Sequence, residues 1–490
     1  WCLILVMPVS HFVRGVPVAA AGTVLALLLA GCGDASTPRS DRQQEVRSSD
    51  TNVKLTDCAS ECTGELDGAK YAIKLPQKWN GTLLLYSHGY RFAAPAPPSF
   101  DAVDTSPQVS STDTDGSGSD ALSESLLQAG YALAGSSYKS NGWAAADGVK
   151  AGTDLHAQFV KLVGTPKRTY VWGDSLGGLV TELLAETHPD WVDGAAPMCG
   201  VLAGPNDNFD VALDVAFAVK TLIDPQLKLT GYTDQADASA NWQHAAEAVQ
   251  KAAADVAGGG TGKVMLIGSL VDAPTATQTY DGHDLPSQVK ARVEAVLTAL
   301  AFGTSGRYEL EQRIGGNPSD NSAADYAKRI DAAETGLIST VGGNPQALLQ
   351  QLAAAPRVSA DATARAAFEQ LGDPTGKLTV PTVTMHTEQD PLVLVQNESV
   401  FAGRVRAEQR SGQLVQLFIK PPATYSETTK APYGAGHCRF SDGQRLGLVK
   451  VLDEWVRRSV HPSPTGSAGA IGEGIDPSYV PGQWPAAESS

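Results

Sequence analysis

Residues 169–179 read TYVWGDSLGGL, and this stretch decides the fold that the sequence predicts. Residues 169–172 are β-rich, the pentapeptide that follows has the form G-x-S-x-G, and the segment after it is compatible with a helix. A strand–turn–helix setting of this kind holds a serine on a strained turn with its hydroxyl exposed. Gly173 and Gly177 are consistent with this turn, because a Cβ at either position would collide with the neighbouring helix or strand. We identify Ser175 as a candidate nucleophile; the alternative is a helix-start turn without chemistry.

Strand and helix signals alternate on both sides of this stretch. Their alternation favours βαβ units and a parallel sheet, hence an α/β fold. Short apolar or β-branched runs predict strands at 71–75, 82–87, 131–136, 194–198, 381–385 and 414–419. Helical spacing of apolar residues predicts helices at 121–129, 154–162, 179–186, 393–405 and 446–460.

The alternation lapses between residues 200 and 376, where the sequence is Ala-rich and helical. The one strand signal there is at 264–267. The flanking pieces, 53–199 and 377–461, suffice for a domain by themselves, so we interpret 200–376 as an inserted helical cap. The Pro- and Gly-containing tail, 462–490, is expected to be irregular.

The N-terminal segment has the pattern of an export signal. An apolar run at 16–29 ends in the sequence LAGC (29–32), which resembles the lipobox of bacterial lipoproteins. We therefore expect residues 1–31 to be a lipoprotein signal peptide and Cys32 to be lipidated, which would anchor the protein at the membrane. The polar stretch 32–52 is expected to be a flexible tether. An ordinary signal peptide with an incidental cysteine is the alternative.

Composition excludes some classes of function. The 490 residues have a formal net charge of −16 and a pI near 5.0, which would repel phosphate backbones, so a nucleic-acid partner is not expected. The hydrophobic content of 42% is enough for a large core, which excludes wholesale disorder. We expect no cofactor.

Export makes disulfides possible. Four cysteines besides Cys2 and Cys32 allow three pairings: Cys58, Cys62, Cys199 and Cys438. The first two are four residues apart in a turn-like segment and are expected to pair, which leaves the other two for each other. Zinc is the competing interpretation, but no histidine has metal-ligand spacing from these cysteines, so no metal is expected.

A serine nucleophile requires a histidine base and an acid that orients it. His437 lies in YGAGHCR (433–439), a glycine-rich loop between the last predicted strand and the last helix. His283, in the predicted cap, is the alternative base. Asp390 follows the strand at 381–385 and precedes a proline; Glu388 is the alternative acid.

Ser175, Asp390 and His437 occur in the order serine, acid, histidine, which is the order of the α/β-hydrolases. The chain resembles a secreted α/β-hydrolase of the serine-esterase kind over 53–199 and 377–461. The resemblance implies an α/β-hydrolase sheet with helices on both faces, and an oxyanion hole. The backbone N–H groups of Leu176 and Tyr90 would form this hole, the latter in the HG-x-like segment 87–90.

The same resemblance places Cys199 and Cys438 at one edge of the sheet, where a bridge would anchor the loop of His437. Two free buried thiols are the alternative. Tannase- and feruloyl-esterase-like enzymes also have a cysteine beside the catalytic histidine. Their partner cysteine directly precedes the serine, where this chain has Asp174.

The sequence therefore predicts an exported serine hydrolase that cleaves ester bonds of a small-molecule substrate. A prolyl-oligopeptidase-like peptidase shares the same catalytic parts and would take a peptide substrate. A non-catalytic, substrate-binding lipoprotein is the third hypothesis, although it gives no reason for the serine turn or the histidine loop.

Overall fold

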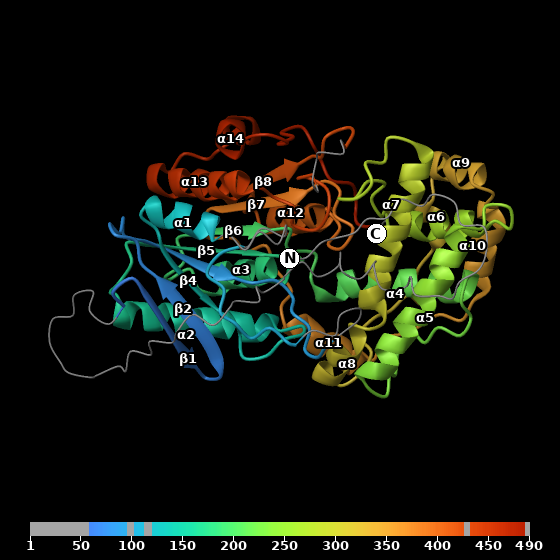
Figure 1. Cartoon of the computed structure of the whole chain (residues 1–490), viewed down its shortest axis with the longest axis horizontal. Coiled ribbons are helices and arrows are strands. Elements are labelled where there is room, and N and C mark those ends of the chain that lie inside the picture. Colours follow the sequence, from blue (N-terminus) through green and yellow to red (C-terminus); the bar gives the residue numbers. More distant parts are fainter. Residues whose placement is uncertain (1–57, 96–101, 112–119, 426–431, 486–490) are drawn as a thin grey trace, which may run out of the picture.

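One mixed sheet of eight strands organises the molecule (Figure 1). The computed structural model describes residues 58–95, 102–111, 120–425 and 432–485. The predicted signal peptide, Cys32 and the predicted tether lie outside these ranges. The strands are β1 (Glu61–Leu66), β2 (Ala69–Lys74), β3 (Thr82–Ser87), β4 (Ala132–Ser136), β5 (Arg168–Asp174), β6 (Gly194–Met198), β7 (Thr382–Thr387) and β8 (Leu414–Ile419).

The strand order is β1-β2-β4-β3-β5-β6-β7-β8. β1 and β2 pair antiparallel, β2 pairs antiparallel with β4, and all later neighbours are parallel. This order, with a helix following β5 directly, is that of an α/β-hydrolase, so the predicted fold class is confirmed.

Both faces of the sheet are buried. Successive residues of a strand point to opposite faces, so a strand that is buried on both faces contributes to two apolar clusters. In β3, Leu83 and Leu85 belong to one apolar cluster, whereas Leu84 and Tyr86 belong to the other. Helices α2 (Ala145–Leu162) and α3 (Leu176–Thr187) cover the first face, and α1 (Ala121–Gln128) and α13 (Asp442–Arg458) cover the second.

Between β6 and β7 the chain forms a group of helices that extends beyond one end of the sheet (Figure 1). We call this group the cap. Its members are α4 (Pro205–Leu222), α5 (Gln235–Ala253), α6 (Gly260–Leu270), α7 (Leu285–Gly303), α8 (Arg307–Ile314), η2 (Tyr326–Arg329), α9 (Ala332–Thr340), α10 (Pro345–Ala354) and α11 (Ala362–Gln370).

Much of the cap packs around an apolar cluster of its own. The strand signal at 264–267 was wrong: these residues lie inside α6, which is buried on almost every side. A helix with no exposed face reads as a continuous apolar run, which the sequence cannot distinguish from a buried strand. Of the helices in the described part of the chain, none has the length and apolar composition that crossing a bilayer requires.

The C-terminal region contains more regular structure than expected. After α12 (Asn397–Ala407), η3 (Ser411–Gln413), β8 and α13, the tail forms α14 (Pro464–Ile471). The Ser463 side chain accepts from the backbone N–H of Gly466, and Pro464 occupies the first turn, so two local signals start this helix. The tail then pairs with β8 through an antiparallel bridge between Ile419 and Ile475.

Candidate active site

Ser175 occupies the sharp turn between β5 and α3. Its backbone has φ 60° and ψ −123°, a conformation that costs free energy in a residue with a Cβ. The turn is fixed from both sides: the Ser175 N–H donates to the Met198 carbonyl at 2.9 Å, and the Ser175 carbonyl accepts from Gly178 at 2.9 Å. The surrounding backbone therefore maintains the strained serine.

The glycines around Ser175 are required because the end of β3 lies against them. A Cβ on Gly173 would lie 2.4 Å from the Ser87 carbonyl oxygen, and one on Gly177 would lie 2.0 Å from the same atom. Both distances are well inside van der Waals contact, and the clashing atom belongs to backbone. The G-x-S-x-G pattern is thus a packing requirement of this turn.

His437 and Asp390 are brought together by two loops that follow β7 and β8. The Nδ1 of His437 donates to Oδ2 of Asp390 at 2.8 Å. The loops are tied through backbone, because the Gly436 N–H donates to the Gln389 carbonyl at 2.7 Å. Thr387 adds a side-chain bond from Oγ1 to the Gly436 carbonyl at 2.9 Å. The imidazole is therefore held with Nδ1 protonated toward the carboxylate.

Asp390 is 1% exposed, and both of its carboxylate oxygens accept hydrogen bonds. Its Oδ1 accepts from the backbone N–H groups of Leu392 at 2.9 Å and Val393 at 3.0 Å. Burial raises the pKa of Asp390, but the neighbouring His437 and His386 outweigh burial and lower it. The carboxylate therefore stays ionised at neutral pH, as a group that orients a histidine must.

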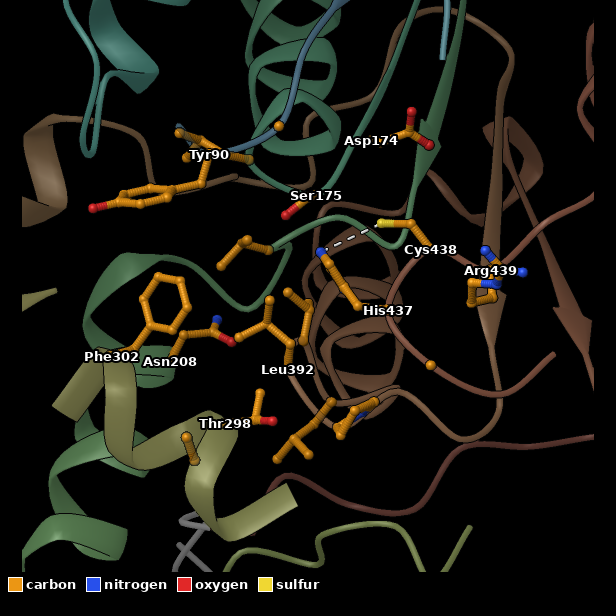
Figure 2. Close-up of a pocket in the computed structure, with 18 of the residues that line it drawn as sticks. Tyr90, Asp174, Ser175, Asn208, Thr298, Phe302, Leu392, His437, Cys438 and Arg439 are labelled. Carbon is orange, nitrogen blue, oxygen red and sulfur yellow. Dashed lines mark hydrogen bonds between the residues drawn. The ribbon is translucent and has the colours of Figure 1, made fainter. Parts of the chain in front are cut away.

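Ser175 and His437 face the same pocket. Figure 2 shows the Ser175 hydroxyl and the Nε2 end of the His437 ring pointing toward each other. Nε2 is also 3.4 Å from the Cys438 sulfur. The structure thus places all three predicted residues, which are far apart in the sequence, at the carboxyl ends of β5, β7 and β8.

The two predicted oxyanion donors lie beside the serine. Leu176 follows it in α3, and Tyr90 follows Gly89, where a Cβ would lie 3.3 Å from the Ser175 Cβ. Leu176 and Tyr90 both line the pocket. The backbone after β3 can approach the serine this closely because residue 89 has no side chain.

His88 supports this loop and is uncharged. Its ring stacks on Tyr138 with centroids 3.9 Å apart, and Nδ1 donates to the Gly89 carbonyl at 2.7 Å. Burial lowers the pKa of His88 to about 3. A neutral, stacked ring fixes the backbone and has no proton available for acid catalysis at neutral pH.

Both predicted disulfides, Cys58–Cys62 and Cys199–Cys438, are formed. Cys199 directly follows β6, so its bridge joins the residue next to His437 to the centre of the sheet. The sulfurs of Cys199 and Cys438 and a ring nitrogen of His437 lie within 4.8 Å of one another, a spacing compatible with a metal. A disulfide, however, has no thiolate to offer as a ligand.

The alternative base and acid lie elsewhere. His283 is about half exposed on the cap and pairs with Asp281 at 2.5 Å. Glu388 lines a second pocket, and burial raises its pKa to about 7. His283 does not line the pocket of Ser175. Asp390 lines the second pocket as well, but it is Asp390 that accepts from the Nδ1 of His437.

A second buried histidine lies behind Asp390, and sequence reasoning treated it as a core residue. His386 is completely buried; its Nε2 is 3.6 Å from Asp390 Oδ2 and its Nδ1 is 3.4 Å from Glu398 Oε1. Burial lowers the pKa of His386, but the two carboxylates outweigh burial and raise it to about 9. Glu398 was missed because nothing in its helical sequence context marks it.

We expect the free energy of unfolding to depend on pH, because His386 lies between two carboxylates that raise its pKa. Unfolding returns His386 to an ordinary pKa near ~6.5, so its stabilising contribution is complete below that pH and is lost as pH rises through about 9. The free energy of unfolding should fall by up to ~3 kcal/mol over this interval. Urea unfolding of wild type and of His386→Gln at several pH values measures it. Groups other than His386 titrate in both proteins and contribute equally to the pH dependence of the free energy of unfolding. If this pH dependence were the same in wild type and in His386→Gln, the assignment would be contradicted.

The pocket lies between the sheet and the cap. Its walls come from the loop after β3, the turn of Ser175, helices α4 and α7, and the two loops that carry Asp390 and His437. Figure 2 shows Phe302, Thr298 and Asn208 on the cap side of this space. None of these cap residues could be assigned to the site from the sequence, because helical insertions carry no motif.

Comparison with known proteins gives a broad likeness. No protein-family model and no curated protein matches the chain. An esterase from Aspergillus oryzae is 14% identical over 81% of this chain and 78% of its own, with a TM-score of 0.37. Feruloyl esterase B from Aspergillus oryzae is 13% identical over 82% and 80%, with a TM-score of 0.36. A proline iminopeptidase from Mycobacterium smegmatis is 14% identical over 81% and 98%, with a TM-score of 0.34. The chain is similar to these structures only in outline, and its α/β-hydrolase fold follows from the strand order of its own sheet.

Proposed function

We propose that this protein is a serine hydrolase that cleaves carboxylic esters through an acyl-enzyme on Ser175. The observation that carries the proposal is the arrangement of the 2.8 Å bond between His437 and Asp390 beside a serine held at φ 60° in the same pocket. A binding protein has no need for a strained serine beside an oriented imidazole.

In the proposed reaction, Nε2 of His437 removes the proton of the Ser175 hydroxyl as the oxygen attacks the ester carbonyl. Asp390 holds the ring and stabilises the imidazolium that forms. The backbone N–H groups of Leu176 and Tyr90 stabilise the oxyanion. His437 then gives its proton to the leaving alcohol, and a water molecule, activated in the same way, releases the acid and restores Ser175.

A fluorophosphonate probe tests the nucleophile, because it forms a covalent bond only with an activated serine. We expect the purified protein to be labelled, and labelling to be lost in Ser175→Ala and His437→Ala. Ser411→Ala, which removes an exposed hydroxyl, should be labelled like wild type. Persistent labelling of Ser175→Ala would overturn the assignment. Hydrolysis of peptide anilides but not of p-nitrophenyl esters would assign the site to a peptidase.

We further propose that the protein is exported and anchored through a lipid on Cys32. The two disulfides support an oxidising compartment, where such bonds persist. A fluorophosphonate that cannot cross membranes should label the protein on intact cells, and the labelled protein should partition into detergent. Cys32→Ala should move it to the aqueous phase; detergent partitioning that survives this change would contradict the anchor.

A further inference from the structure

One face of α7 runs along the cap side of the pocket. The lining residues of this helix are Glu294, Ala295, Thr298, Ala299 and Phe302. Their spacing places them on one stripe of the helix. At 1.5 Å per residue, the stripe extends ~12 Å from its first member to its last.

Phe302 marks the end of this stripe nearest the reaction. Its ring lies 5.4 Å from the ring of Tyr90, centroid to centroid. Tyr90 is adjacent to Gly89, where a Cβ would lie 3.3 Å from the Ser175 Cβ. Glu294 lies two helical turns before Phe302 and therefore ~12 Å from it along the helix.

Most of the surface between these two ends is apolar, with Thr298 as its polar member on α7. Two alanines of α7 contribute to it, together with side chains from the loop after Asp390 and from the segment after α6: Leu392, Leu394, Val271 and Ala273. Such walls favour a methylene chain or another apolar spacer between the reactive carbonyl and the remote end.

Glu294 is a carboxylate in an apolar wall, and it is only 8% exposed. Its Oε2 accepts from the Thr277 hydroxyl at 2.9 Å. Among the described residues, no lysine, arginine or histidine forms an ion pair with it. The nearest cations on α7 are engaged elsewhere: Lys290 lies over the Tyr280 ring, and Arg292 pairs with Glu334. Burial raises the pKa of Glu294 to about 7, although its hydroxyl partners oppose the shift.

A buried carboxylate without a countercharge is costly, and a ligand that supplies a positive charge relieves the cost. We propose that Glu294 binds a protonated amine at the far end of the substrate's acyl group. This inference rests on the proposed ester hydrolase and names a substrate class for it: esters of amino-terminated, medium-length acids.

We place the acyl group, and not the alcohol, against the cap because His437 has to give its proton to the leaving alcohol. His437 must protonate the leaving oxygen, so the alcohol lies on its side of the serine. Figure 2 shows His437, Cys438 and Arg439 on one side of Ser175, and Tyr90 and Phe302 on the other. The acyl group then lies on the side of Tyr90 and Phe302, and the pocket-lining stripe of α7 leads from Phe302 to Glu294.

Three p-nitrophenyl esters of equal chain length test the proposal: ω-amino octanoyl, ω-hydroxy octanoyl and nonanoyl. The wild-type protein should hydrolyse the amino ester with the highest kcat/KM. Glu294→Gln keeps the shape and removes the charge, and should lower kcat/KM for the amino ester by ~10- to 100-fold, the size of a hydrogen bond to a charged group. The nonanoyl ester should change by less than ~3-fold, since it makes no such bond.

Glu247→Gln is the matched control, because it removes the same charge from an exposed position on α5 of the cap. It should behave like wild type with all three esters. A wild-type preference for the hydroxy or nonanoyl ester would overturn the inference without any variant. So would an equal loss for all three esters in Glu294→Gln.

Failure of the proposed function gives a different result. In that case the wild-type protein would hydrolyse none of the esters, and fluorophosphonate would not label Ser175. Hydrolysis of the nonanoyl ester without preference for the amine would remove only the role of Glu294.

Discussion

Alanine in place of His437 should lower kcat for a p-nitrophenyl ester by about a millionfold, with little change in KM. The loss is this large because the imidazole both removes the proton from Ser175 and returns it to the leaving group, and members of such a unit fail together. The residual rate would come from binding and from the oxyanion donors. Stopped and continuous assays of p-nitrophenol release measure both parameters.

His283→Ala is the control, because His283 is the other histidine that the sequence offers as a base. It is half exposed on the cap and does not line the pocket, so its loss should leave kcat unchanged. Activity retained by His437→Ala and lost by His283→Ala would require a different site. Thermal unfolding of both variants distinguishes lost chemistry from lost structure.

Removing the Cys199–Cys438 bridge should produce the largest loss of stability. The bridge joins residues 239 positions apart, and in the chain-entropy description a loop of that length contributes ~5 kcal/mol. The double variant Cys199→Ala/Cys438→Ala should therefore unfold at much lower urea concentration. Its kcat should also fall by up to ~10²-fold, because His437 is adjacent to the bridge and small displacements of a catalytic group are costly.

The other bridge provides a matched control. Cys58 and Cys62 are four positions apart, so their loop contributes only ~2 kcal/mol. Cys58→Ala/Cys62→Ala should lose less stability and no activity. If both double variants lost equal stability, loop closure would not explain the effect of the long-range bridge. Unchanged kcat in Cys199→Ala/Cys438→Ala would show that the backbone bonds of Gly436 are enough to position the histidine.

Where the sheet is buried on both faces, its sequence was enough to predict it. β3 coincides with the apolar run 82–87, because every one of its residues is buried. β1 was not predicted, since its sequence ECTGEL is polar and only every second residue is partly buried. An edge strand lacks the apolar pattern that identifies a central one.

The residues of the site also fall into those that the sequence predicts and those that it does not. Ser175, Asp390 and His437 could be named because each follows a predicted strand, and the carboxyl ends of parallel strands meet at one edge of a sheet. Glu398 and Glu294 could not be named, because each lies in a helix whose spacing looks like that of any amphipathic helix. Their importance comes from three-dimensional neighbours that sequence spacing does not encode.

The pairing of the tail with β8 has a consequence for solubility. A bare edge strand is a template on which another molecule can add a strand and begin fibrous growth. Here the Lys420 N–H donates to the Gly474 carbonyl at 2.7 Å, and the Asp476 N–H donates to the Phe418 carbonyl at 2.8 Å. The chain thus occupies part of this template itself, while the opposite edge carries the repelling charges of Glu61 and Glu65 in β1. Both edges of the sheet are therefore protected against the addition of a strand from another molecule.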